Sequence, residues 1–390
     1  MGLAAFAVGG LEPTRHETPA TAGEVAECVR LADAKGDAVI AFGGRTDLEA
    51  GNAPRRYDVA LDLRRLDAVV EHEAGDLTAT VGAGTRLASL AARLAASGQM
   101  WPVEVPRPEL ATVGGVLAGA TAGPSRLRYA HPRDWTLGVR AVLGDGTLTK
   151  AGGKVVKNVS GYDLTRFYSG SRGTLCVIVE ASLKLWPVPE AERVLVSRFD
   201  DVREAQNTLA LLRSEGVDLD AAASLDRAAA AYVGEERALA IARVRGANAV
   251  VARLVDRVSR AIGGCEEARP GLLADAADVP LRAAIALRLT APESRMRDAL
   301  GGAGDGVLRF DGSGIAFLVR ERADASWVQE QRIRVEALEG SAILQRAPAS
   351  LRAQVDTWGT PALPLDLARR IKAALDPRGT LSPGRFVGGI

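Results

Sequence analysis

Residues 154–175 read KVVKNVSGYDLTRFYSGSRGTL and hold more chemically particular side chains than any other stretch of the sequence. Lys154 and Lys157 lie three positions apart, and glycines recur through the stretch. Glycine lets a backbone approach a ligand closely, and the lysines favour an anionic ligand. A solvated loop between two strands is the alternative, because glycine-rich polar runs commonly form one. The apolar run Leu175–Val179 that follows is typical of a buried strand and favours an ordered turn.

Two earlier segments have a similar glycine-rich character. Val39–Phe42 is a predicted strand that leads directly into Gly43–Asp47, which reads GGRTD. Successive backbone N–H groups in such a turn can form a nest for an anion. Thr112–Gly115 reads TVGG and precedes a run of small residues, which permits close packing of the backbone against a ligand or a sheet.

A third glycine pair raises the question of a dinucleotide-binding fingerprint. The predicted strand Thr78–Gly82 runs into Gly82-Ala83-Gly84-Thr85 and a predicted helix over 87–97. The third glycine of that fingerprint would fall on Leu87, so the pattern is incomplete. We therefore favour the interpretation that these glycines only form a tight strand-to-helix turn.

Composition and charge exclude several classes of protein. A chain of 390 residues is long enough for two domains. A net charge of +1 and 4% aromatic residues give no support for nucleic-acid binding. Histidines and cysteines are too few and too scattered for an iron–sulfur or metal centre. No run reaches the about 18 apolar residues of a membrane-spanning helix, and the N-terminus lacks a signal peptide, so we expect a cytoplasmic protein whose membrane contacts are made through partners. The three cysteines and three histidines are Cys28, Cys176, Cys265, His16, His72 and His131.

The order of predicted elements indicates the α+β class. Helices are expected over 18–36, 87–97, 202–214, 247–262 and 365–375. Strands are expected over 39–42, 58–63, 78–82, 136–143, 147–149, 177–185, 194–199, 239–244, 283–289 and 314–319. Thr21 is the expected N-cap of the first helix, with Glu24 completing a capping box.

Four sequence blocks carry a resemblance to a known family. They are Gly43–Pro54, Thr112–Gly115, Gly152–Leu185 and Leu375–Phe386. Together they resemble the flavoprotein family named after vanillyl-alcohol oxidase and p-cresol methylhydroxylase (PCMH), and within it the E-subunit group of bacterial glycolate oxidases. The resemblance implies a PCMH-type FAD-binding domain of two α+β subdomains over residues 1–189. It further implies a smaller α+β cap domain over 190–350, and a C-terminal helix and tail over 351–390 that return to the FAD domain.

The resemblance also implies which residues bind FAD. The pyrophosphate would be wrapped by Gly43, Gly44, Arg45, Thr46 and Asp47. A second segment would lie along the pyrophosphate and the ribityl chain, namely Thr112, Val113, Gly114 and Gly115. The flavin side of the cleft would be lined by Lys157, Asn158, Gly161, Tyr162 and Asp163. The cofactor would be further enclosed by Gly170, Ser171, Gly173, Thr174, Val177 and Ile178.

The function that this resemblance implies is oxidation of glycolate or another small 2-hydroxy acid. FAD would be bound non-covalently, because the Gly43–Asp47 loop contains neither histidine nor cysteine. The implied partners are a D-like FAD subunit and an iron–sulfur subunit of a glycolate oxidase complex. The sequence singles out no catalytic base and no metal ligands, and residues 190–350 contain no histidine. Two alternatives stay open, namely a non-catalytic scaffold subunit with an FAD-type fold and a stand-alone hydroxy-acid dehydrogenase.

Overall fold

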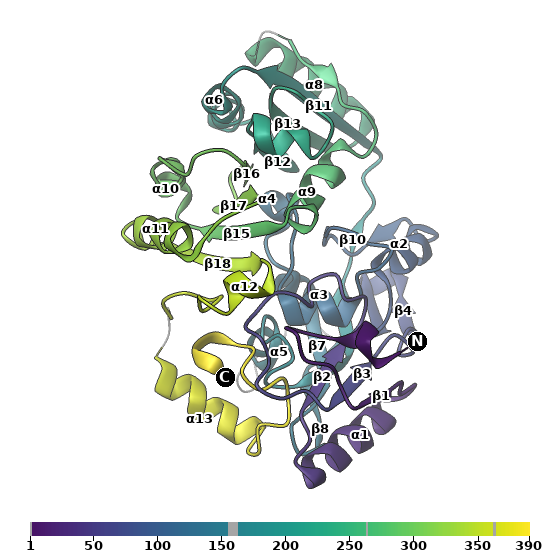
Figure 1. The fold of residues 1–390 in the computed structure, drawn as a ribbon. Coiled ribbons are helices and arrows are strands. Elements are labelled where there is room, and N and C mark those ends of the chain that lie inside the picture. Colours follow the sequence, from purple (N-terminus) through teal and green to yellow (C-terminus); the bar gives the residue numbers. More distant parts are fainter. Residues whose placement is uncertain (1, 155–162, 263, 362–363) are drawn as a thin grey trace. The chain divides into compact units, whose positions relative to one another are not determined.

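The computed structural model describes residues 2–154, 163–262, 264–361 and 364–390. The chain divides into two compact units. The first unit comprises Met1–Thr121, His131–Val188 and Thr360–Ile390, and the second comprises Ala122–Ala130 and Pro189–Gly359 (Figure 1). Helices and mostly antiparallel strands are mixed in both units, which confirms the predicted α+β class.

The first unit contains two principal sheets. A parallel sheet has the order β1-β3-β2, and an antiparallel sheet has the order β4-β5-β9-β7-β8. The strands of the two sheets are β1 (Arg15–Glu17), β2 (Val39–Phe42), β3 (Val59–Asp62), β4 (Val69–Glu73), β5 (Thr78–Gly82), β7 (Thr136–Val142), β8 (Leu148–Gly152) and β9 (Val177–Lys184). A separate pair joins β6 (Gln99–Met100) to β10 (Trp186–Pro187). The α-helices of this unit are α1 (Ala22–Lys35), α2 (Leu87–Ala95), α3 (Val113–Gly119), α5 (Leu164–Tyr168) and α13 (Leu365–Leu375).

Local sequence explains where α1 begins and ends. The Thr21 hydroxyl accepts a hydrogen bond from the Glu24 N–H, and the Glu24 carboxylate accepts one from the Ala20 N–H. The first bond satisfies a backbone donor that the first helical turn leaves free. The second bond comes from the residue before the N-cap and not from the Thr21 N–H, so only the Thr21 half of the predicted capping box is formed. Gly36 ends the helix in the left-handed conformation, with φ of 74°.

The C-terminal tail is an integral part of the parallel sheet. Leu381 forms a parallel bridge with Val39 at the edge of β2. The Val39 N–H donates to the Thr380 carbonyl, and the Ser382 N–H donates to the Val39 carbonyl. Because β2 leads into the Gly43–Asp47 loop, the tail supports the base of that loop.

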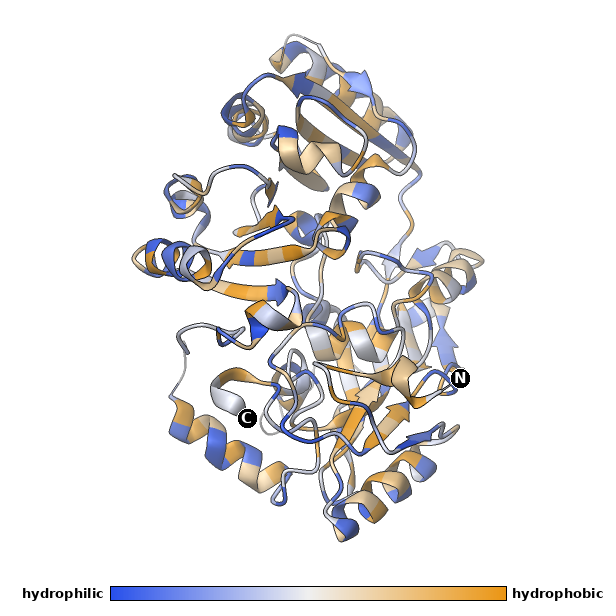
Figure 2. Ribbon diagram, in the orientation of Figure 1, coloured by the Kyte–Doolittle hydropathy of each residue, from blue (hydrophilic) through white to orange (hydrophobic). Residues whose placement is uncertain are grey.

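The second unit is built on one eight-stranded antiparallel sheet with the order β14-β11-β13-β12-β16-β17-β15-β18. Figure 2 shows apolar residues concentrated along its strands, which form the core of this unit. The strands are β11 (Ala191–Phe199), β12 (Ala221–Leu225), β13 (Ala238–Gly246), β14 (Glu266–Glu267), β15 (Ile285–Thr290), β16 (Val307–Phe310), β17 (Ile315–Arg320) and β18 (Ser341–Arg346). The helices are α4 (Arg126–Tyr129), α6 (Val202–Ser214), α7 (Arg227–Ala231), α8 (Asn248–Ala261), α9 (Leu272–Arg282), α10 (Met296–Leu300), α11 (Ala325–Glu336) and α12 (Ala349–Arg352).

Among the described residues, no helix has the length and apolar character needed to span a membrane. They also contain no group of three or more histidine, cysteine, aspartate or glutamate side chains that could hold a metal ion.

Candidate cofactor site

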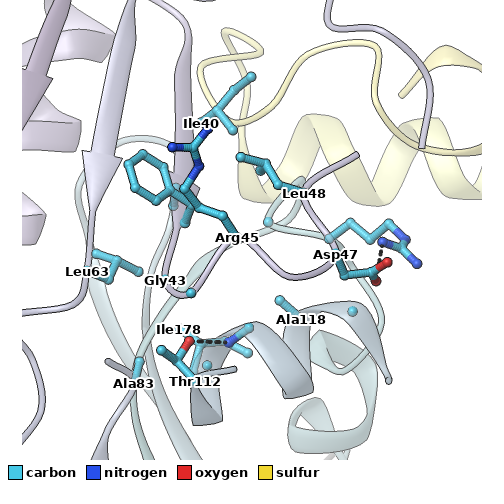
Figure 3. A pocket seen from close by; sticks show the side chains of 18 of the residues that line it. Ile40, Gly43, Arg45, Asp47, Leu48, Leu63, Ala83, Thr112, Ala118 and Ile178 are labelled. Carbon is cyan, nitrogen blue, oxygen red and sulfur yellow. Dashed lines mark hydrogen bonds and ion pairs between the residues drawn. The ribbon is translucent and has the colours of Figure 1, made fainter. Parts of the chain in front are cut away.

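An open cavity of about 820 Å³, part of it solvent-exposed, lies in the first unit where three glycine-rich segments meet. Figure 3 shows the Gly43–Asp47 segment on one side and Thr112 and Ala118 of α3 on the other. Eleven of the predicted cofactor-binding residues line this cavity. They are Gly43, Gly44, Arg45, Thr46, Asp47, Thr112, Gly114, Gly115, Gly173, Val177 and Ile178.

Both positions of the glycine pair that follows β2 need glycine, because neighbouring atoms lie too close for a side chain. A Cβ atom on Gly43 would lie 2.1 Å from the Thr112 Oγ1 atom. A Cβ atom on Gly44 would lie 1.7 Å from the Leu110 carbonyl oxygen, inside van der Waals contact. The Gly43–Asp47 segment forms the first wall of the cavity, and only glycine allows it to lie directly against the segment that leads into α3.

The first wall presents hydrogen-bond donors to the cavity. No described residue accepts a hydrogen bond from the backbone N–H groups of Gly44, Arg45 or Thr46. Arg45 adopts the left-handed conformation, with φ of 63°. Consecutive free N–H groups in a turn of this kind form a concave site suited to an anion.

The second wall is the short helix α3. Thr112 caps it, since its hydroxyl accepts a hydrogen bond from the Gly115 N–H at 3.3 Å. The Val113 and Gly114 N–H groups are already used, because they donate to the carbonyls of Thr85 and Ala83. Val113 itself is fully buried in the core and does not line the cavity. Val113 was predicted to lie beside the cofactor, whereas the structure places its side chain in the core behind the wall.

The glycines of the β5–α2 turn serve packing. Cβ atoms on Gly82 and Gly84 would each lie 2.1 Å from a backbone carbonyl oxygen, that of Leu66 and that of Leu63. Neither glycine lines the cavity, although Ala83 between them does. This arrangement agrees with the interpretation of a tight strand-to-helix turn and gives no support for a dinucleotide fingerprint.

The third wall runs from residue 170 to residue 178. Gly173, Val177 and Ile178 face the cavity, whereas Gly170, Ser171 and Thr174 lie behind it. The Gly170 N–H donates to the Leu117 carbonyl, which ties this segment to α3. The Thr174 hydroxyl donates to the Ser171 carbonyl, and both residues are buried. These three residues do not line the cavity, and their hydrogen bonds hold the wall in place.

The remaining predicted residues belong to the stretch before α5. Lys157, Asn158, Gly161 and Tyr162 lie outside the described residues. Asp163 is described and does not line the cavity. It caps α5, where its carboxylate accepts a hydrogen bond from the Arg166 N–H.

Among the lining residues that were not predicted, three carry ionisable side chains, namely Arg172, Cys176 and Arg385. Arg172 pairs with Asp47 at 2.9 Å. Arg385 reaches the cavity from the C-terminal tail and donates hydrogen bonds to the carbonyls of Leu48 and Ala50. Both arginines lie inside blocks already singled out in the sequence, GSRGTL and PGRF, and a search for cations within those blocks would have found them.

Cys176 differs from the two arginines because it is almost fully buried. The side chain belongs to the core cluster, and it also lines the cavity. Burial raises the pKa of its thiol well above the usual value. The thiol is therefore protonated at neutral pH and is a poor nucleophile.

Comparisons with known proteins agree with this geometry. Residues 13–152 match the family model described as an FAD binding domain. The chain is 40% identical over 151 residues to glycolate oxidase subunit GlcE of Escherichia coli, which is 38% of this chain and 43% of that protein. It is 31% identical over 171 residues to glycolate oxidase subunit GlcD of Bacillus subtilis, which is 44% of this chain and 36% of that protein. It is 32% identical over 203 residues to D-2-hydroxyglutarate dehydrogenase of Xanthomonas citri, which is 52% of this chain and 43% of that protein.

A solved structure extends the likeness to nearly the whole chain. Alkyldihydroxyacetonephosphate synthase superposes with a TM-score of 0.71 at 18% identity, covering 96% of this chain and 77% of that one. At this identity the likeness concerns the fold. The sequence relatives match this chain over less than half of their own length, and the matched region contains the first two walls of the cavity. An FAD binding domain is thus matched over residues 13–152, which contain the Gly43–Asp47 and Thr112–Gly115 segments on which the resemblance rests.

Proposed function

We propose that the chain is an FAD-dependent oxidoreductase that acts on the CH–OH group of a small 2-hydroxy acid, with glycolate as the leading substrate. We further propose that it works as the FAD-binding subunit of a glycolate oxidase complex, beside a D-like FAD subunit and an iron–sulfur subunit. The observation that carries the proposal is the cavity whose first two walls lie inside the matched FAD binding domain. Relatives named as glycolate oxidase subunits and as a D-2-hydroxyglutarate dehydrogenase support the substrate class.

The residues present fit FAD. The free N–H groups of Gly44, Arg45 and Thr46 and the Arg45 guanidinium would hold its diphosphate. Apolar side chains would pack against its rings and exclude water. These are Ile40, Leu63, Ala83, Val177 and Ile178.

When bound, the flavin supplies the acceptor for a hydride from the substrate carbon. The chain itself positions the flavin and sets the electrostatic field around it. The Arg172 guanidinium neutralises Asp47, so that the cavity wall presents net positive charge toward an anionic cofactor. We propose that Lys157 and Tyr162 lie near the flavin ring, and we assign no catalytic base.

We propose that FAD is held non-covalently. The Gly43–Asp47 loop has no histidine or cysteine, and the Cys176 thiol is kept protonated by burial. Acid precipitation of the holoprotein is expected to leave the yellow flavin in the supernatant. Flavin that stays with the precipitate would contradict this part of the proposal.

We also propose a division of labour along the chain. Residues 1–189 together with 351–390 would bind the cofactor, and residues 190–350 would form the cap over the substrate. The likeness to the synthase, which extends over 96% of this chain and 77% of that one, concerns the fold of both parts.

The decisive experiment is anaerobic reduction of the bound flavin by glycolate and by D-lactate, with and without the candidate partner subunits. The proposal predicts a flavin absorbance band in the purified chain and bleaching of that band by a 2-hydroxy acid when partners are present. A colourless chain that does not take up FAD would favour the scaffold alternative. Full bleaching without partners would favour a stand-alone dehydrogenase.

A further inference from the structure

One segment of the matched FAD binding domain belongs to the second unit. This crossover segment, Ala122–Ala130, lies within residues 13–152 and yet packs as part of the second unit, where its helix α4 contacts strand β12. It follows α3 closely, because Ala120 caps that helix and Thr121 is the last residue of the first unit before the segment begins. The second wall of the cavity therefore continues directly into a segment that the second unit holds.

A buried arginine fastens the crossover segment to the sheet of the second unit. Arg243 lies in β13, between β11 and β12, and is 3% exposed. Its Nη2 atom donates a hydrogen bond to the hydroxyl of Ser125, which is also 3% exposed. The fully buried Asp220 carboxylate fixes the same guanidinium, at 2.8 Å from Nε and 2.7 Å from Nη2. Arg243 thus joins the crossover segment to a strand inside the eight-stranded sheet.

An ion pair this deeply buried contributes little to stability by itself. Removing two charges from water costs about as much as their attraction returns, and an apolar pair of similar volume is often as stable. What an apolar pair lacks is an N–H donor with a fixed direction. The Arg243–Asp220 pair supplies this donor, and its hydrogen bond to the Ser125 hydroxyl is charge-assisted. The pair therefore specifies where the crossover segment lies.

The crossover segment also makes an exposed polar contact. Arg128 donates hydrogen bonds to both carboxylate oxygens of Asp218 at 2.8 Å. The two side chains are 33% and 66% exposed, and ion pairs at the surface restrain a segment only weakly. The Arg128–Asp218 pair therefore provides a matched comparison for the buried contact of the same segment.

The end of α3 in turn holds the third wall of the cavity. The Leu117 carbonyl accepts a hydrogen bond from the Gly170 N–H, and the Ala118 carbonyl accepts one from the Arg172 N–H. Ala118 and Arg172 both line the cavity. A shift at the end of α3 would therefore displace lining groups on two walls at once.

We propose that Arg243 is a positioning residue for the cofactor cavity. Held by Asp220, it fixes Ser125, and thereby the end of α3 and the third-wall segment that is bonded to α3. Arg243 lies outside the matched FAD binding domain, so binding of the cofactor depends on a residue of the second unit. The effect on α3 stands by itself, whereas the effect on cofactor affinity rests on the FAD binding proposed above.

The first test follows hydrogen exchange of backbone amides in the full-length apoprotein, by mass spectrometry of peptides from α3, the third wall and β13. Ser125→Ala removes the acceptor and leaves the Arg243–Asp220 pair in place. Exchange is expected to become about 10-fold faster at the end of α3 and in the peptide that contains Gly170 and Arg172, with β13 unchanged. A role confined to the second unit would leave the peptides of α3 and of the third wall unchanged.

A double variant separates positioning from stability. Arg243→Met combined with Asp220→Leu removes the donor and leaves neither charge of the pair behind. Arg245, which lies 3.7 Å from the Asp220 carboxylate, keeps its ion pair with Glu192. The midpoint of urea unfolding is therefore expected to stay close to that of the wild type. Exchange in α3 is nevertheless expected to rise as it does in Ser125→Ala.

The second test is titration of the same apoproteins with FAD, followed by flavin fluorescence. Ser125→Ala and the double variant are expected to bind FAD about 5-fold more weakly, because the walls are then less well preorganised. Arg128→Gln is the matched control, since it removes the exposed contact of the same segment. It is expected to show wild-type exchange and wild-type FAD affinity.

The outcomes separate the positioning role from the proposed function. Wild-type exchange in α3 of both Ser125→Ala and the double variant would overturn the positioning role. Faster exchange in α3 with wild-type FAD affinity would overturn it as well, because the shift would then not reach the cavity. A wild-type chain that binds no FAD would contradict the proposed function, and the exchange data would then decide alone whether Arg243 positions α3.

Discussion

Asp47 and Arg172 are 125 residues apart in the chain and form an ion pair of 2.9 Å in the wall of the cavity. Both side chains are largely buried, with 16% and 10% of their surface exposed. The pair fastens the first wall to the third. It also removes a negative charge from a site that faces an anionic cofactor.

Breaking this pair should weaken both the fold and the binding of FAD. Arg172→Gln leaves Asp47 without its counter-charge, and we expect a loss of about 2–3 kcal/mol in the free energy of unfolding. Asp47→Asn should cost less, because the amide oxygen can still accept a hydrogen bond from Arg172. Urea unfolding and FAD titration of both variants and of the double variant measure the coupling. If the two single losses simply add in the double variant, the pair does not act as a unit.

The close approach at Gly44 gives a second prediction. In Gly44→Ala the new methyl group would meet the Leu110 carbonyl oxygen at 1.7 Å, so the backbone must move. We expect a loss of about 3 kcal/mol in unfolding free energy and loss of measurable FAD binding. Gly75→Ala is the control, since no atom lies within 4 Å of a Cβ at that position. A Gly44→Ala variant with wild-type FAD affinity would contradict the assigned first wall.

The sequence predicted much of the candidate site and missed the parts that the termini contribute. The three glycine-rich segments are recognisable because a backbone that approaches another backbone needs glycine, and this need is visible locally. Arg385 reaches the site because the tail pairs with Val39, and the buried Phe6 packs against β2 behind the cavity-lining Ile40 and Phe42. The resemblance in the Leu375–Phe386 block implied that the tail returns to this domain, whereas no local pattern around Leu3–Phe6 predicts the packing of that turn.

The same contrast holds for the fold of the second unit. The predicted helices over 202–214 and 247–262 correspond to α6 and α8, because their apolar residues recur with helical period. Strand β12, whose sequence is AAASL, was not predicted, because alanine has a low preference for strands. Its residues are all buried between β13 and β16, so tertiary pairing decides its conformation.

Acidity should stabilise the second unit through Asp311. Burial raises the pKa of this carboxyl to about 6, although Arg309 and a hydrogen bond from Ser224 act in the opposite direction. In the unfolded chain the pKa is near 3.8, so between about pH 4 and pH 6 the native state binds more protons than the unfolded state. The free energy of unfolding must then fall as the pH rises through this window, by up to about 3 kcal/mol.

The variant Asp311→Asn isolates this contribution, because its amide stays neutral at every pH. Relative to wild type, the variant should gain stability as the pH rises from 4.5 to about 7, as measured by urea unfolding at several pH values. Asp305→Asn serves as the exposed control and should follow the wild-type profile. Parallel profiles for wild type and Asp311→Asn would show that the carboxyl titrates normally in the folded protein.

Lys372 links the third wall of the cavity to the C-terminal tail, and its removal should loosen both. Its ammonium group donates to the carbonyls of Thr174 and Leu381, at 2.6 and 2.8 Å, and to the Asp376 carboxylate at 2.5 Å. Burial lowers the pKa of Lys372, and Asp376 opposes that effect. Lys372 and Asp376 thus form a buried ion pair, in which each charge is compensated by the other.

In Lys372→Met the side chain keeps its length and loses its charge, so Asp376 is left buried without a cation. We expect a loss of about 3 kcal/mol in the free energy of unfolding and weaker FAD binding, because the segment that carries Thr174 also forms the third wall. Adding Asp376→Asn should recover part of the stability, since it removes the unpaired charge. Arg370→Ala, an exposed change on the same helix, should have little effect in urea unfolding or FAD titration. If Lys372→Met loses stability and still binds FAD like the wild type, the Lys372–Asp376 ion pair stabilises the tail alone. The third wall is then held by its own hydrogen bonds.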